Sequence, residues 1–169
     1  YAVTWLNDGG SEIATSELLE GAAIAYKGET PVKEADAQYT YEFAGWVDAE
    51  GNPLAEDAVM GTEAVTYTAT YTATVNKYIV SFVVDGEVVS AEEYEYGAMP
   101  VAPEVTDKED ADKVYTFVGW DAEVSAVTGE ATYTAQFEAT KKSYTITWII
   151  DGTSETTTVE YGEMPTHAD

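Results

Sequence analysis

Tyr78-Ile-Val-Ser-Phe-Val-Val-Asp-Gly86 is the stretch that decides the fold. Its side chains alternate in direction along an extended backbone, so Val80 and Phe82 share one face while Ile79 and Ser81 share the other. β-Branched and aromatic residues in this alternation predict a strand with one buried face. Asp-Gly at the end predicts a tight hairpin turn, because glycine reaches positive φ without strain. A strand, a hairpin and a second strand are therefore expected.

The same phrase occurs three times in the chain, which indicates tandem modules. Its two other copies are Tyr1-Ala-Val-Thr-Trp5 and Tyr144-Thr-Ile-Thr-Trp148. Two later phrases recur in the same order: Phe43-Ala-Gly-Trp46 as Phe117-Val-Gly-Trp120, and Tyr67-Thr-Ala-Thr-Tyr71 as Tyr133-Thr-Ala-Gln-Phe137. The repeats predict one module over 1–77, a second over 78–143, and the N-terminal half of a third, truncated module over 144–169.

Each complete module is expected to contain four strands. In the second and third modules the second strand stops at Tyr-Gly followed by Met-Pro. In both complete modules the third strand closes on Gly-Trp and the fourth carries the last repeated phrase. The polar connections 27–38 and 103–113 have room for one or two helical turns, although their prolines oppose a long helix. The predicted fold class is mainly β, and α+β at most.

The chain is strongly acidic, with 32 Asp and Glu residues, 7 lysines, and a formal net charge of -25. Such a charge repels phosphate groups, so no nucleic-acid partner is expected. No run of 18 apolar residues occurs, and membrane insertion of this segment is not expected either. Cysteine is absent, which removes disulfides and thiolate metal sites from consideration. A hydrophobic content of 45% is sufficient for folded cores.

The ordered phrases resemble the Listeria–Bacteroides repeats, the family of the internalin B-repeat. The resemblance covers essentially the whole chain, and Gly-Trp at a fixed distance from the closing strand is its most specific element. It implies tandem small β-grasp-like modules of the mucin-binding type, each a four-stranded mixed sheet with at most one short helix. The first module departs from the pattern, because Glu20-Gly21 replaces Tyr-Gly.

Trp46 and Trp120 are the candidate ligand-binding residues, since a sugar ring can stack on an exposed indole. The competing interpretation places both indoles in or over a small core, because each ends an aromatic-rich strand beside a glycine. The core interpretation is favoured. Trp5, Phe82 and Trp148 occupy one position of the repeated phrase, so bulk is required there, and all three are expected in a core.

No catalytic, cofactor or metal site is predicted. The acidic stretch 107–112 and the turn around Asp48 lack the spacing of a calcium-binding loop, so a solvated loop is expected for each. No lysine lies on an apolar strand face, which argues against isopeptide cross-links. The single histidine, His167, has no nucleophile in its sequence neighbourhood. The chain is therefore expected to be a non-enzyme.

Two functional hypotheses remain. The leading one is a non-catalytic stalk or spacer in an adhesin-like protein of the bacterial cell surface, hence extracellular. The alternative is that the modules themselves bind a host glycan or protein. The segment 144–169 is expected to leave a sheet edge open, which either the end of the preceding module or a neighbouring molecule would cover. The neighbouring molecule is favoured, so self-association with 1–20 or with a second copy of 144–169 is expected.

Overall fold

The computed structural model describes residues 1–167, and all of their regular elements are β-strands. The chain divides into two compact units, Tyr1–Asn76 and Lys77–Asp169. The prediction of a mainly β fold is confirmed, and the connections 27–38 and 103–113 contain no helical turn. Residues 1–167 likewise contain no helix long and apolar enough to cross a membrane. The division into three modules stays a prediction.

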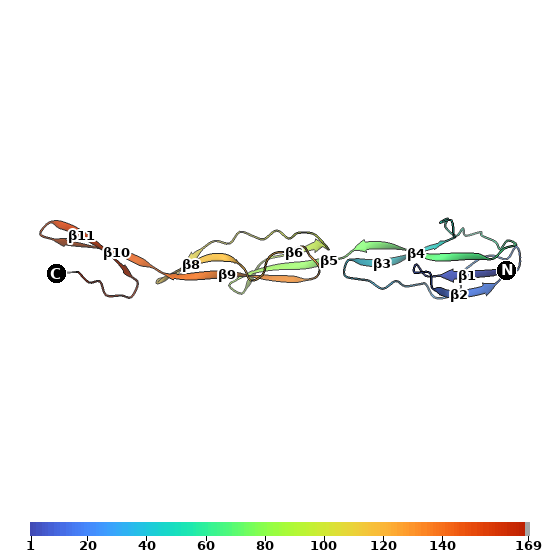
Figure 1. Cartoon of the computed structure of the whole chain (residues 1–169), viewed down its shortest axis with the longest axis horizontal. Helices are drawn as coiled ribbons and strands as arrows, with labels where there is room; N and C mark the ends of the chain where they lie inside the picture. Colours follow the sequence, from blue (N-terminus) through green and yellow to red (C-terminus); the bar gives the residue numbers. More distant parts are fainter. Residues whose placement is uncertain (168–169) are drawn as a thin grey trace. The chain divides into compact units, whose positions relative to one another are not determined.

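The first unit forms a four-stranded mixed sheet in the order β2-β1-β4-β3 (Figure 1). Its strands are β1 (Ala2–Leu6), β2 (Glu12–Glu17), β3 (Tyr39–Val47) and β4 (Val65–Val75). β1 pairs antiparallel with β2 and parallel with β4, which in turn pairs antiparallel with β3. A parallel pair needs a long crossover between its strands, and here the crossover contains β2, β3 and their loops.

The second unit repeats this arrangement and adds one short strand at the edge, giving the order β6-β5-β9-β8-β7. Its strands are β5 (Lys77–Val84), β6 (Glu87–Glu95), β7 (Lys108–Glu109), β8 (Lys113–Trp120) and β9 (Ala131–Lys141). The register is preserved as well: Trp5 lies beside Tyr67 in the first sheet, and Phe82 beside Tyr133 in the second. The two-residue β7 is the one departure from the four predicted strands.

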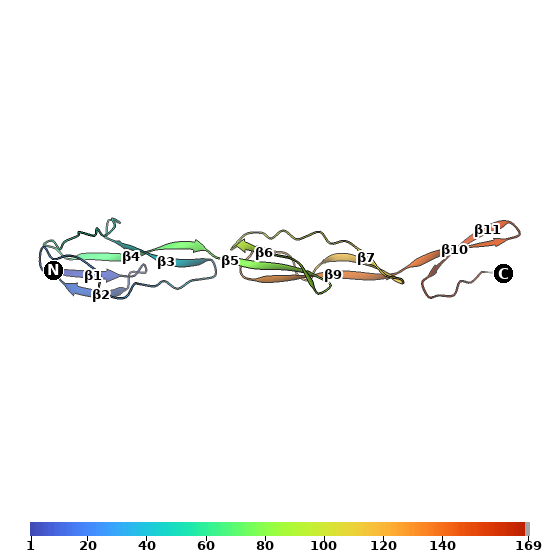
Figure 2. The ribbon, with the colours of Figure 1, turned by 180° about the vertical axis from the view of Figure 1, so that it is seen from behind.

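Unit 2 also contains a separate hairpin of β10 (Ser143–Ile150) and β11 (Thr153–Glu160), seen from behind in Figure 2. Its turn is Asp151-Gly152, with φ of 49° and 82°, and the turn after β5 is Asp85-Gly86, with φ of 54° and 83°. Positive φ at both central residues suits the twist of a two-residue hairpin. Both turns confirm the prediction from Asp-Gly.

Each sheet covers a small core with one face. In the first unit the buried residues are Val3, Trp5, Ile24, Trp46, Met60, Tyr67 and Ala69. In the second unit the core cluster consists of Val80, Phe82, Val127 and Tyr133, and Ala135 is buried as well. Trp5 and Phe82 are 2% and 1% exposed, as predicted for their shared position. Trp148, at the same position in β10, is only half-buried. The prediction for Trp148 is wrong, because no strand beside β10 among residues 1–167 supplies the tyrosine that covers its counterparts.

A pair of backbone hydrogen bonds ties the end of the second strand to the loop before the fourth. Gly21 N–H donates to the Met60 carbonyl and Met60 N–H to the Ala22 carbonyl; Gly97 and Ala98 exchange the same bonds with Val127. Gly21 and Gly97 have φ of 77° and 84°, a left-handed conformation that favours glycine. Glu20-Gly21 therefore occupies the place of Tyr-Gly, and the glycine is the residue that this place requires.

Candidate functional site

Trp46 and Trp120 are positioned by the same β-bulge in the two sheets. The register shifts between Phe43 and Gly45 in β3, and between Phe117 and Gly119 in β8. The bulge inserts one residue, so side chains three positions apart share a face instead of opposing each other. The rings of Phe43 and Trp46 thus meet edge-to-face with centroids 5.5 Å apart, as do those of Phe117 and Trp120.

Glycine is required inside each bulge. Gly45 has a φ of 131° and Gly119 a φ of 136°, a region that residues with a Cβ rarely adopt. The Phe-x-Gly-Trp phrase therefore encodes the β-bulge, and the bulge directs the indole toward the core. The sequence contained this signal as a spacing of three between two aromatic residues, which plain strand alternation does not allow.

Both indoles pack in or against a core, as the favoured interpretation predicted. Trp46 is 9% exposed and contacts the rings of Trp5 and Tyr26 at 4.7 Å each. Trp120 is half-buried and lies edge-to-face on Phe82 at 4.8 Å. Aromatic pairs in this geometry stabilise the fold beyond the area that they bury.

A hollow of about 460 Å³ lies beside Trp46 in the first unit. Aromatic and aliphatic side chains line it, with Thr30 and Glu56 among its polar residues. The apolar lining consists of Ile24, Ala25, Tyr26, Pro31, Phe43, Trp46, Leu54 and Ala55. Leu54 to Glu56 follow the inserted turn of the first module, and Leu54 N–H donates to the Trp46 carbonyl where that turn closes. The inserted turn therefore positions one wall of the hollow beside Trp46.

The chemistry of this hollow suits an uncharged ring. Aromatic side chains offer a stacking surface, and a few polar groups can orient a hydroxylated ligand. Glu56 is acidic and none of the lining residues is basic, so an anionic ligand is disfavoured. The prediction that Trp46 belongs to a ligand site stays untested, and the same holds for Trp120.

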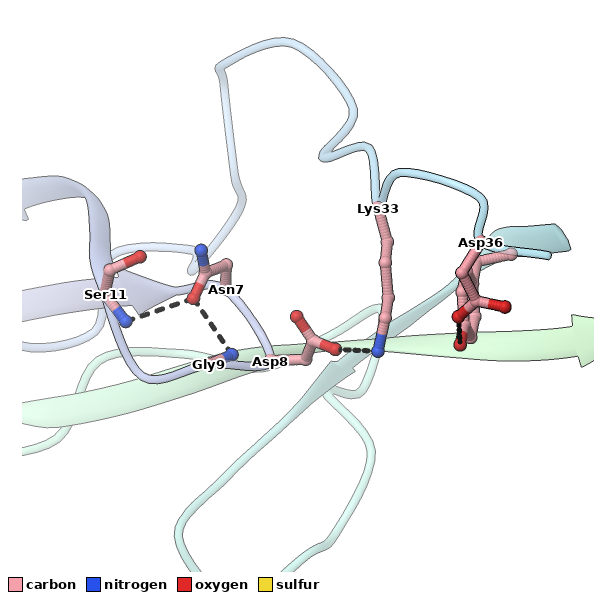
Figure 3. Close-up of polar contacts among 7 residues, drawn as sticks. Asn7, Asp8, Gly9, Ser11, Lys33 and Asp36 are labelled. Atoms are coloured by element: carbon pink, nitrogen blue, oxygen red, sulfur yellow. Dashed lines mark hydrogen bonds and ion pairs between the residues drawn. The ribbon is translucent and has the colours of Figure 1, made fainter. Parts of the chain in front are cut away.

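A lysine in each unit holds the connection before the third strand against the first hairpin. Lys33 binds the Asp8 carboxylate (Figure 3). It also lies 4.4 Å above the ring of Tyr41. In the second unit Lys108 binds Asp85 and lies 4.2 Å above the ring of Phe137. Sequence reasoning missed these clamps, because a lysine in a polar connection gives no periodic signal.

The Lys33 clamp is an ion pair that does not favour an isopeptide bond. The hydrogen bond to Asp8 raises the pKa of Lys33 above its ordinary value. A protonated amine has no lone pair with which to attack a carboxyl carbon. The ammonium and carboxylate of this pair also remain partly exposed to solvent. The clamp is thus a structural contact between two loops.

An aspartate whose carboxylate accepts several hydrogen bonds precedes the third strand in each unit. The Asp36 carboxylate accepts hydrogen bonds from the N–H of Gln38 and Tyr39 and from the Tyr41 hydroxyl. Asp110 accepts the corresponding bonds from Asp112, Lys113 and Tyr115. The stretch 107–112 was predicted to be a solvated loop. Instead it contains β7 and uses Asp107 and Asp110 as acceptors for backbone N–H groups.

These hydrogen bonds favour the charged carboxylates. The Lys113 N–H, followed by the Tyr115 hydroxyl and the Asp112 N–H, holds the pKa of Asp110 well below its ordinary value. The Tyr39 N–H is the largest cause of the lowered pKa of Asp36. In the turn around Asp48, the side chain and backbone of Asn52 lower the pKa of Asp48. Among residues 1–167 no three acidic or histidine side chains are arranged to hold a metal ion.

His167 lies against the β10–β11 hairpin. Its ring packs on Trp148 with centroids 5.2 Å apart, and its Nε2 lies 3.1 Å from a Glu155 carboxylate oxygen. Neither neighbour is a nucleophile that an imidazole would activate. The position of His167 after the Tyr-Gly turn corresponds to that of Tyr26, whose ring packs on Trp5 at the same 5.2 Å. The imidazole therefore serves as a small cover over the indole.

Similarity to known proteins does not assign this chain to a family. No family model matches the chain, and no curated protein matches it. A solved structure of streptococcal high identity repeats in tandem (SHIRT) domains 3-4, from a cell surface protein, is similar at 15% identity. The match covers 84% of this chain and 99% of that one, with a TM-score of 0.40. At this score the likeness carries no conclusion about family or function.

Replacing Asp110 by Asn is expected to remove a pH-dependent contribution to stability. The contribution is fully present above the pKa of an unfolded Asp, about 3.9, and is lost as pH falls from there through the lower folded-state pKa. The unfolding free energy of wild-type unit 2 should therefore decrease between about pH 5 and pH 2. The variant should be less stable at pH 7 and show a smaller decrease.

Urea unfolding at several pH values, followed by the amide NMR signals of β8 and β9, measures this effect. Glu123→Gln removes the same charge from an exposed position and should keep the wild-type pH dependence. An equal pH dependence in wild type and Asp110→Asn would contradict the assigned role of Asp110.

Proposed function

We propose that this chain is a non-catalytic tandem-repeat segment of an adhesin-like bacterial surface protein, in which it acts as an extracellular stalk or spacer. The supporting observation is the connection between successive repeats. One residue, Asn76, separates β4 from β5, and one residue, Lys142, separates β9 from β10. So short a connection leaves little slack for one module to reorient against the next.

Both connecting residues are also anchored to the segments that precede β3 and β8. Asn76 N–H donates to the Gln38 carbonyl, and its side-chain amide donates to the Asp36 carbonyl at 2.7 Å. Lys142 N–H donates to the Asp112 carbonyl in the same way, and its ammonium lies 3.2 Å from Glu109. Together with the repeated phrases, these anchors support a β-grasp-like array that extends by copying one unit.

The spacer proposal predicts an elongated particle in solution. A compact chain of 169 residues has a radius of gyration of about 15 Å, and small-angle X-ray scattering should give a clearly larger value. Inserting Gly-Gly-Ser after Asn76 should broaden the distance distribution, because the anchored connection becomes flexible. The same insertion into the exposed Gly9-Gly10 loop is the control and should change nothing. A wild-type value near 15 Å would contradict the proposal.

A second candidate function is the binding of a host glycan or protein by the modules. The observation that favours it is the hollow beside Trp46, with its aromatic wall and few polar groups. Because the chain carries a net charge of -25, neutral sugars are expected to bind in preference to acidic ones. This candidate is compatible with a spacer, since one module of an array can carry a site that others lack.

Blocking the hollow tests this candidate directly. Ala55→Trp places a large side chain in its exposed wall without altering the buried core, and should abolish any binding seen on a glycan array. Ala122→Trp adds the same bulk at an exposed position of the second unit and should leave binding unchanged. Equal signals from wild type and Ala55→Trp would rule out the hollow as the binding site.

A further inference from the structure

The sheet of unit 2 is connected to its neighbours in the chain through two of its strands, β5 and β9. β5 follows β4 after one residue, Asn76, and β9 leads to β10 through one residue, Lys142. β6, β7 and β8 begin and end within the same unit. Tension along the chain therefore enters this sheet at the N-terminal end of β5 and leaves it at the C-terminal end of β9.

The register of β5 and β9 places these two ends on opposite sides of a short overlap. The strands run parallel, and the overlap pairs Val80–Val83 with Ala131–Thr134 (Figure 2). β5 begins three residues before the overlap, and β9 continues beyond it to Lys141. Tension thus pulls the strands past each other along their own axes, so the hydrogen bonds of the overlap share the load. An antiparallel pair pulled at its adjacent ends would break one bond after another.

Tyr133 holds the overlap through its backbone and its ring. Thr134 bonds to Asp121 through both its N–H and its C=O, so the alternation along β9 directs the backbone groups of Tyr133 toward β5. The ring of Tyr133 stacks on Phe82 with centroids 5.4 Å apart, and both rings are buried. A slip of one residue, about 3.3 Å, would carry the rings off each other and expose apolar surface to water.

Unit 1 has an overlap of the same length at the corresponding place. There β1 and β4 pair Val3–Leu6 with Val65–Thr68, and Tyr67 stacks on Trp5 at 5.3 Å. The crossover between the strands is longer in unit 1 than in unit 2, yet the paired residues and the stacked rings keep their register. β4 then continues through Asn76 into β5, so tension passes from the first overlap to the second with one residue between the strands.

We propose that the parallel overlap in each unit is a load-bearing element, which lets the chain withstand tension along its length. Its biological setting rests on the proposed spacer function, because a spacer between two attached surfaces is pulled along its chain. The mechanical property itself depends only on strand pairing within one unit. A compact profile in the scattering experiment would therefore remove the spacer function without deciding the mechanical one, which needs its own measurement.

Pulling one fold in two directions tests the overlap. The chain contains no cysteine, so pairs of introduced cysteines can attach DNA handles at chosen positions of the full chain for optical tweezers. Lys77→Cys with Thr140→Cys pulls β5 and β9 in shear. Lys77→Cys with Glu95→Cys pulls the paired ends of β5 and β6 and peels this antiparallel hairpin apart. All three positions are exposed, so the substitutions leave the core intact.

The rupture force in shear is expected to be at least about twofold the force in peeling at the same loading rate, because the paired residues resist together and not in turn. Complete opening between Lys77 and Thr140 lengthens the tether by at most about 230 Å, at ~3.6 Å for each extended residue, which identifies the event. A shear force equal to or below the peeling force would overturn the proposal.

Two leucine variants test the stacked rings in the same pair of geometries. Tyr133→Leu removes the ring from the overlap, and should lower the shear force while the peeling force stays unchanged. Phe117→Leu is the matched control, because this ring packs on Trp120 and Phe137 outside the overlap, and it should leave both forces unchanged. Amide NMR signals of β5 and β9 verify that both variants keep the sheet. Equal shear forces for the two variants would contradict the load-bearing role of the stacked pair.

Discussion

The parallel pairing of the first and last strands of each repeat is the constraint on which the rest of the fold depends. It brings together residues that are about sixty positions apart in the first unit and about fifty apart in the second. The pair aligns Trp5 with Tyr67 and Phe82 with Tyr133, and in both units the two rings stack at the centre of the core. The bulged third strand then adds an indole to the same cluster. Without the parallel pair, each opening hairpin would lose the tyrosine that stacks on the aromatic ring of its apolar face.

The excess of acidic residues is compatible with this fold because several carboxylates accept backbone hydrogen bonds. Asp36, Asp48 and Asp110 each bind N–H groups of a neighbouring turn, which lowers their pKa values and makes the charge a part of the turn. Two of the 7 lysines, Lys33 and Lys108, pair with aspartates of the first hairpins. Charged side chains thus hold the loops in place through hydrogen bonds and ion pairs, while aromatic packing stabilises the sheets.

Much of the strand pattern was predictable from the sequence, whereas the contacts between distant elements were not. Alternation and Asp-Gly turns located β5, β6, β10 and β11, because these signals are local. Strand order was not encoded locally, since no residue of β5 specifies that β9 lies beside it. The hollow beside Trp46 depends on where the inserted segment folds back, and the Lys33 clamp depends on the meeting of two loops. Trp148 was misjudged because its burial requires a neighbouring strand.

Native-state hydrogen exchange of two equivalent amides tests the central role of the parallel pair most directly. Ser81 and Thr147 occupy the same position in β5 and β10, and both direct their N–H groups away from the hairpin partner. Ser81 N–H should exchange only through unfolding of unit 2, because β9 covers it. Thr147 N–H should exchange close to the rate of an unstructured peptide. Equal protection of the two amides would contradict the account, since β10 would then be closed without a parallel strand.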